Sequence, residues 1–133
     1  MNDLQRSVAQ ACLQGAENGS KSFPEIVGAL IAAGFESYLV DYRRAVAIYY
    51  LADGDSVELP THRIDAPVAA EFDAPAIQAA IREAQQLADG YTYLGFCRKT
   101  AAAGCAGYIV SFSGRRALYF GRTGETHLEH FPD

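Results

Sequence analysis

The sequence predicts an α+β domain in which a unit of two helices and three strands occurs twice. A shift of 70 positions, which carries Gly34 onto Gly104, aligns the stretch that begins AAGFESYLV with the one that begins AAGCAGYIV, without gaps. In both copies a helical period of apolar residues gives way to the alternation of a strand. Each unit has one apolar sheet face and too few helices to cover it alone. We therefore expect the units to join in a mainly antiparallel six-stranded sheet with the four helices packed on one face.

The two copies agree most closely where the strands are expected. Conservative pairs such as Leu39 with Ile109 keep their character across the repeat. We therefore expect residues 23–59 and 93–131 to share strand order and handedness about a pseudo-twofold axis. The identical pairs are Ala32 with Ala102, Ala33 with Ala103, Gly34 with Gly104, Tyr38 with Tyr108, Val40 with Val110, Ala47 with Ala117, Tyr49 with Tyr119 and Gly54 with Gly124.

Two helices are expected in the first half. Asp3 is the expected cap of a helix over residues 3–16, which has a modest apolar stripe. Ser22 stands three residues before Glu25, the spacing of a capping box, and predicts a second helix that ends at Gly34.

Three strands should follow these helices. Alternation of apolar and polar residues begins at Glu36 and predicts a first strand that reaches Tyr42. A tight connection at residues 43–45 leads to a second strand over residues 46–51. The turn signal Asp53-Gly54 precedes a short third strand over residues 57–59.

The second half repeats this order after a linker over residues 61–72. Asp73 opens a third helix that Gly90 closes, and Thr92 caps a fourth that runs to about residue 103. The expected strands are residues 108–112, 116–121 and 126–131, with turns at Ser113-Gly114 and Thr123-Gly124.

Length and charge limit the class of protein. The 133 residues fit one domain, with pseudo-repeats over about residues 3–60 and 73–132. A net charge of −5, from 16 acidic and 11 basic side chains, disfavours binding to nucleic acid or anionic membranes. The start of the chain lacks the pattern of a signal peptide, and no apolar stretch is long enough for a membrane span. We expect a cytoplasmic protein that is a monomer or a homodimer.

Two stretches carry a family resemblance. The segment FPEIVGALIAAGFESYLVDY in the first half and YLGFCRKTAAAGCAGYIVSFSGRRALYFGRTGETHLEHFP in the second resemble the YdfO-like family. These are small proteins of bacteria and prophages, some of them labelled "phage envelope protein". The resemblance covers nearly the whole chain and is most specific over residues 104–132. It implies an α+β fold and no established activity, cofactor or catalytic residue.

Histidine and cysteine provide the candidates for an enzyme. On a strand, His127 and Glu129 point to one face and His130 to the other, so a metal would need a further ligand such as His62 or Cys97. The interior of a helix is a poor place to activate Cys97 as a nucleophile. The three cysteines have no CxxC spacing, and we expect buried free thiols, no metal and no cofactor.

Arginines and tyrosines provide candidates for binding. Arg44 and Arg116 lie at or beside equivalent hairpin turns, with Arg122 near the next turn, and would form two related basic spots or one shared cleft. The guanidinium fork suits a carboxylate or a phosphate. Tyr49 and Tyr119 occupy equivalent strand positions; they would form a binding surface if no helix covers them, and would pack as core residues otherwise.

The leading hypothesis is a non-catalytic binding or regulatory module with a groove between its two halves. The groove would take a protein partner or a small acidic ligand. The alternative is a small enzyme that uses Cys97, or His127 with Glu129, supported by Tyr119 and Arg122. A third hypothesis is a homodimer formed through an exposed sheet face or an edge strand. Positions that break the repeat are the preferred functional candidates: Arg116 opposite Val46, Arg122 opposite Ala52 and His127 opposite Val57.

Overall fold

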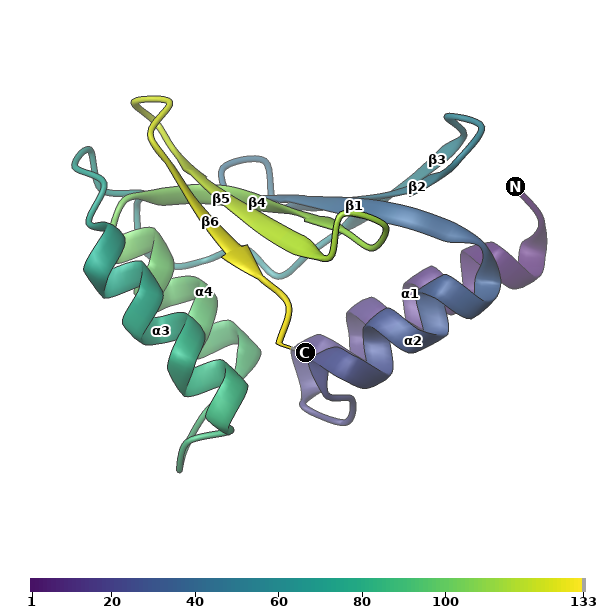
Figure 1. Cartoon of the computed structure of the whole chain (residues 1–133), viewed down its shortest axis with the longest axis horizontal. Helices are drawn as coiled ribbons and strands as arrows, with labels where there is room; N and C mark the ends of the chain where they lie inside the picture. Colours follow the sequence, from purple (N-terminus) through teal and green to yellow (C-terminus); the bar gives the residue numbers. More distant parts are fainter. Residues whose placement is uncertain (133) are drawn as a thin grey trace.

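Four helices lie on one side of a six-stranded sheet (Figure 1). The computed structural model describes residues 1–132. Two helix pairs, α1 with α2 and α3 with α4, diverge beneath the sheet. The helices are α1 (Asp3–Asn18), α2 (Phe23–Ala33), α3 (Ala74–Gln86) and α4 (Tyr93–Ala102), and the strands are β1 (Phe35–Asp41), β2 (Val46–Leu51), β3 (Ser56–Pro60), β4 (Cys105–Ser111), β5 (Arg116–Gly121) and β6 (Thr126–His130). The predicted α+β fold with helices on one face is confirmed.

The sheet has the order β3-β2-β1-β4-β5-β6, and every neighbouring pair is antiparallel. Each strand of the second half starts and ends 70 residues after its counterpart in the first. In the central pairing of β1 with β4, Leu39 lies opposite Ile109, which is its own counterpart. The pseudo-twofold axis therefore passes between these two residues, and the helix-helix-strand unit repeats as predicted.

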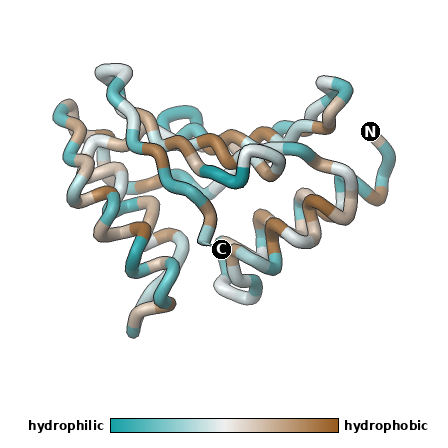
Figure 2. The backbone as a smooth tube through the Cα atoms, in the orientation of Figure 1, coloured by the Kyte–Doolittle hydropathy of each residue, from teal (hydrophilic) through white to brown (hydrophobic). Residues whose placement is uncertain are grey.

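The core lies between the sheet and the helices. Tyr38 stacks on Tyr49 with ring centroids 5.3 Å apart, and the equivalent pair Tyr108 and Tyr119 has the same separation. All four rings are buried between the sheet and the helices. Figure 2 shows the hydrophobic stretches running through the central strands, while the loops are mostly hydrophilic. The same aromatic packing thus supports both halves.

The other side of the sheet has no helix over it in the described residues, 1–132 (Figure 1). A row of aliphatic side chains crosses this open face, one on each of five successive strands in cross-strand register. Ile109 and Leu128 are the most exposed of them, at 39% and 41%. The row consists of Ile48, Leu39, Ile109, Leu118 and Leu128.

Several helix ends differ from the predictions. The cap of α1 is Asn2 rather than Asp3, because Asn2 and Gln5 form the reciprocal bonds of a capping box. The helix continues past residue 16 to Asn18, where Gly19 takes the left-handed conformation. In contrast, α3 ends before Gly90, because Leu87 already has a φ of 48°.

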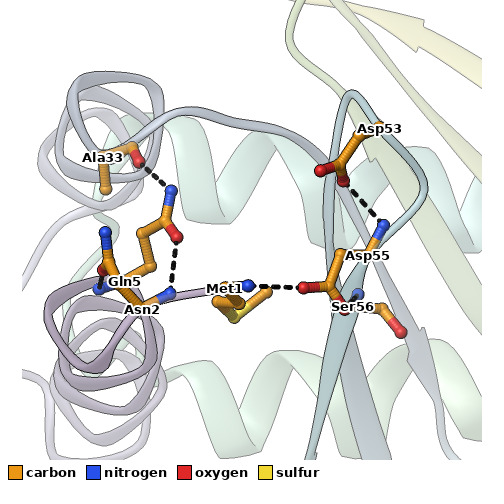
Figure 3. A network of polar contacts seen from close by, with 7 residues as sticks. All are labelled: Met1, Asn2, Gln5, Ala33, Asp53, Asp55 and Ser56. Carbon is orange, nitrogen blue, oxygen red and sulfur yellow. Dashed lines mark hydrogen bonds and ion pairs between the residues drawn. The ribbon is translucent and has the colours of Figure 1, made fainter.

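The N-terminal region is tied to the first half by polar contacts (Figure 3). The side chain of Gln5 donates to the carbonyl of Ala33 at the end of α2, at 3.0 Å. The ammonium group of Met1 lies 2.6 Å from the carboxylate of Asp55 in the turn after β2. This bond lowers the pKa of Asp55, helped by a hydrogen bond from the backbone N–H of Ser56.

Candidate functional site

A pocket of about 180 Å³ lies where the two halves meet, on the helical side of the sheet. The first half provides the end of α1 and the end of β1, the second provides the first turns of α4, and residues 61–65 of the linker complete the wall. The volume equals about six water molecules at roughly 30 Å³ each, which suits a small organic molecule.

Two tyrosines, Tyr42 and Tyr93, line the pocket, and the hydroxyl of each has a partner within the protein. Tyr42 lies 2.9 Å from the hydroxyl of Thr100, and Tyr93 lies 2.6 Å from the hydroxyl of Tyr108. The Thr100 hydroxyl donates to the helix carbonyls of Phe96 and Cys97. When the Thr100 proton is on a helix carbonyl, Tyr42 is the donor towards Thr100; in the opposite arrangement Thr100 donates to Tyr42. The Tyr42 hydroxyl is also a neighbour of the Cys97 thiol.

The charged groups of the pocket differ in their exposure to solvent. Glu17 is the inner one, with a side chain only 11% exposed; it accepts a bond of 2.8 Å from the backbone N–H of His62. The His62 ring, 67% exposed, lies 3.6 Å from the same carboxylate. At the rim, Arg98 pairs with Asp65 at 3.0 Å, and this pairing lowers the pKa of Asp65. Arg63 also lines the pocket, with its guanidinium 3.5 Å from the carbonyl of Arg43. Glu17 places a carboxylate inside.

Cys97 lines the pocket and is almost fully buried. Burial raises the pKa of its thiol to about 11, the nearby tyrosine hydroxyls oppose this rise, and the negative charge of Glu17 adds to it. At neutral pH the thiol is therefore protonated and acts as a small, weakly polar wall.

The repeat provides an internal comparison for this wall, because all of its residues except Ile64 and Asp65 have a counterpart 70 positions away. Four polar residues of the pocket, and Thr100 behind it, correspond to apolar residues in the other half. The other half thus has the same helices and strands with hydrocarbon at these positions. The pairs are Tyr42 and Phe112, Tyr93 and Phe23, Cys97 and Val27, Thr100 and Leu30, and Thr61 and Phe131.

The last of these pairs explains the free volume. Phe131 packs edge-on against Phe23, with ring centroids 5.7 Å apart. At the related place in the pocket, Thr61 stands near Tyr93 and has no ring to fill the space. Both residues extend their edge strands in the same way. The backbone N–H of Thr61 donates to the carbonyl of Ala45, and the backbone N–H of Phe131 donates to the carbonyl of Arg115. The exchange of one ring for a hydroxyl thus leaves the backbone unchanged.

The arginines predicted to form basic spots lie apart. Arg44 is in the β1–β2 turn and Arg116 begins β5, at opposite ends of the antiparallel central strands. Arg44 lies 3.9 Å from Glu58, and Arg116 bonds the carbonyl of Gly114. Arg122 donates to the carbonyl of Val68 at 3.1 Å and so fastens a turn to the linker. They form separate spots rather than one cleft.

The two candidate tyrosines are in the core. Tyr49 is 3% exposed and Tyr119 is 7% exposed, both beneath the helices. Burial raises the pKa of each hydroxyl. The helices pack on the face of the sheet that carries Tyr49 and Tyr119. These two tyrosines therefore do not form an exposed binding surface.

His127 and Glu129 share one face of β6, as the strand period predicted. Their side chains are 3.0 Å apart and partly buried, and the His127 ring packs near Tyr119. His130 is on the opposite face, across from Arg116. Within residues 1–132, no three or more potential metal ligands gather. Since β6 is an edge strand and the pocket lies at the junction of the halves, this pair does not line the pocket.

The family follows from comparison with known proteins. Residues 10–129 match the family model described as "Protein of unknown function (DUF1398)". The chain belongs to the DUF1398 family. No curated protein matches this DUF1398 chain. No helix in residues 1–132 is long and apolar enough to cross a bilayer.

Most of the residues that line the pocket of this DUF1398 protein are not among the candidates from its sequence. The candidates from the sequence do not include Glu17, Thr61 or Tyr93, and His62 is among them only as a metal ligand or as a base beside Cys97. The signal was present in the repeat as polar residues aligned with apolar ones. The positions chosen from the sequence because they break the repeat, Arg116, Arg122 and His127, have basic side chains. The pocket instead contains uncharged replacements, with Tyr in place of Phe, Cys in place of Val and Thr in place of Phe.

Proposed function

We propose that this DUF1398 protein is a non-catalytic binding module that holds a small molecule in the pocket between its halves. One observation carries the proposal: the pocket wall is polar where the equivalent wall of the other half is apolar. The buried hydroxyls are hydrogen-bonded within the protein, Tyr42 to Thr100 and Tyr93 to Tyr108, so they do not reduce its stability. The other half shows that the fold does not need them, and a polar ligand is a reason for them to be there.

The test copies one half onto the other. Thr61→Phe should place a ring against Tyr93, as Phe131 does against Phe23, and fill the cavity. Thr61→Val is the matched control, since it removes the hydroxyl and adds no bulk. In a fragment screen by protein-observed NMR, we expect hits that shift the signals of Tyr93 and Cys97 in the wild type and in Thr61→Val, and are lost in Thr61→Phe. Hits that bind all three proteins equally would count against the pocket.

The competing proposal of a small enzyme has weaker support. The Cys97 thiol is protonated at neutral pH, and His127 with Glu129 lies on an edge strand. An acidic ligand held by arginines is a further form of the binding proposal, but Arg44 and Arg116 would have to act at separate points.

A second candidate function is association through the open face. The aliphatic row, which includes Leu39 and Ile109, is the observation that favours it. Apolar patches without a cover are typical of interaction sites. Light scattering over a range of concentrations distinguishes a monomer from a homodimer, and Ile109→Lys should reduce any association through this face.

Two finer assignments also belong to the proposal. The segments around residues 23–42 and 104–132 support kinship with the YdfO-like proteins of bacteria and prophages. An acidic chain of ordinary globular composition is in keeping with a place in the cytoplasm. Fractionation of cells that express the tagged protein tests the second assignment.

A further inference from the structure

The acceptors inside the pocket indicate the chemistry of its ligand. Glu17 presents a carboxylate that is largely shielded from solvent. One of its oxygens accepts from the backbone of His62, and the second is 3.6 Å from the imidazole, outside ordinary hydrogen-bond distance. This second oxygen has capacity for a further donor.

Tyr42 adds a hydroxyl to the residues that line the pocket. When its proton is on Thr100, its oxygen can accept a hydrogen bond from a ligand. The aromatic side chains of Tyr42 and Tyr93 also line the pocket. Val40 and Leu94 give the remaining wall an apolar surface.

Three basic residues line the pocket, His62, Arg63 and Arg98, and all three are exposed. The Arg63 guanidinium bonds the carbonyl of Arg43 at 3.5 Å. Arg98 is at the rim, more than half exposed, and is already paired with Asp65. The His62 ring is also mostly exposed. An anion that passed the rim would meet the shielded carboxylate of Glu17, and like charges at low solvent exposure repel strongly.

We infer that the ligand of this pocket is a small organic amine, bound as its ammonium ion by Glu17 and Tyr42 with its apolar body against Val40 and Leu94. The inference rests on the proposed function and adds the ligand class. It gives the shielded carboxylate a counter-charge, which buried charges require.

The experiment compares three probes of similar shape and different charge: benzylamine, benzyl alcohol and benzoate. Binding is measured by NMR shifts of pocket residues at pH 7. We expect benzylamine to bind and benzoate to leave the pocket signals unchanged. Glu17→Gln keeps an acceptor for the His62 N–H and removes the charge, and it should weaken benzylamine binding by at least about tenfold. Glu58→Gln, on the open face, is the control and should have no effect.

The outcomes separate the two proposals. If benzoate or benzyl alcohol binds as tightly as benzylamine and Thr61→Phe abolishes binding, the pocket is a ligand site and the assignment to amines is wrong. Unchanged benzylamine affinity in Glu17→Gln also overturns that assignment. If no probe shifts the pocket signals and the fragment screen fails as well, both proposals fall. Should Glu17→Gln not fold, Tyr42→Phe removes the second acceptor, and an unchanged affinity there has the same meaning.

Discussion

The hydroxyl groups of Tyr42 and Thr100 face each other where the other half has the phenyl ring of Phe112 and the side chain of Leu30. Thr100 is fully buried, and so is Leu30. The pair therefore exchanges a hydrophobic contact for a hydrogen bond at the same place in the fold. Such exchanges cost little when both partners change and more when one changes alone.

A double-mutant cycle tests this exchange. Tyr42→Phe should lower the free energy of unfolding by about 1 kcal/mol, because it removes one hydrogen bond. Thr100→Leu should cost about 1–3 kcal/mol, because it leaves the buried Tyr42 hydroxyl without an acceptor. The double variant, which copies the other half, should lie within about 1 kcal/mol of the wild type. Urea unfolding measures all four proteins, and strictly additive losses would contradict the idea of a matched pair.

Thiol reactivity tests the assignment of Cys97 as a wall rather than a nucleophile. Burial raises the pKa of Cys97 to about 11 and that of Cys105 to about 12. At pH 7.5, thiolate at Cys97 is therefore at least about 100-fold scarcer than in a free cysteine. Iodoacetamide followed by mass spectrometry should show slow modification of all three cysteines in the folded protein and fast modification in urea. Selective rapid labelling of Cys97 would instead favour the enzyme.

At the scale of the elements, the sequence predicted what periodicity and caps control. The capping box at Ser22 and the Asp-Gly turn signal before β3 specify local geometry, so α2 and the β2–β3 hairpin were found correctly. The ends of α1 and α3 were misplaced by a few residues. Leu87 adopts the left-handed conformation, which is rare for leucine, so no local pattern in the sequence predicts that α3 ends there.

Two equivalent glycines predict a difference between the halves. Gly34 and Gly104 both have positive φ values, 99° and 94°. A Cβ at Gly34 would meet only the Gln5 side chain, at 3.5 Å, whereas a Cβ at Gly104 would lie 2.0 Å from the carbonyl oxygen of Glu71. Gly34→Ala should therefore cost about 1–2 kcal/mol of backbone strain, and Gly104→Ala clearly more, because the linker must move. Thermal unfolding of the two variants compares them directly, and equal losses would contradict the close approach of the linker.

At the scale of the whole molecule, seven tyrosines have a raised pKa, with burial as the main cause in each. Folding thus favours their protonated forms. The stability they contribute is fully present below the unfolded pKa of about 10 and is lost as the pH rises above it. The raised pKa values of Cys97 and Cys105 also make stability fall as the pH rises, and this loss begins at a lower pH because an unfolded thiol has a lower pKa than a tyrosine.

Alkaline unfolding should therefore be cooperative. One pH unit above the unfolded value costs about 1.4 kcal/mol for each tyrosine that stays protonated, so several together approach the whole stability of a small domain. We expect circular dichroism and tyrosinate absorbance to change together between about pH 10 and 12. Gradual titration of all the tyrosines near pH 10, with circular dichroism unchanged, would be inconsistent with their burial.

The site was less predictable than the fold, and the reason is physical. Strand order and the helical face follow from hydrophobic period and the repeat, both of which are local or pairwise properties of the sequence. The pocket depends on Glu17, residues 61–65 and the first turns of α4 coming together, and no local pattern places a linker against two helices. Tyr42 and Tyr93 are also compatible with an ordinary core, so only their comparison with Phe112 and Phe23 singles them out.

The position of Leu39 opposite Ile109 has a consequence for how such a protein can change over generations. If two identical subunits formed this sheet, residue 39 would pair with its own copy, and every side chain in one wall would also appear in the other. Joining the subunits in one chain removes that obligation. One wall can then carry Glu17 and its hydroxyls while its twin stays hydrocarbon and is filled by Phe131. Duplication followed by fusion thus allows a single, one-sided site in a molecule that still has the framework of a symmetric dimer.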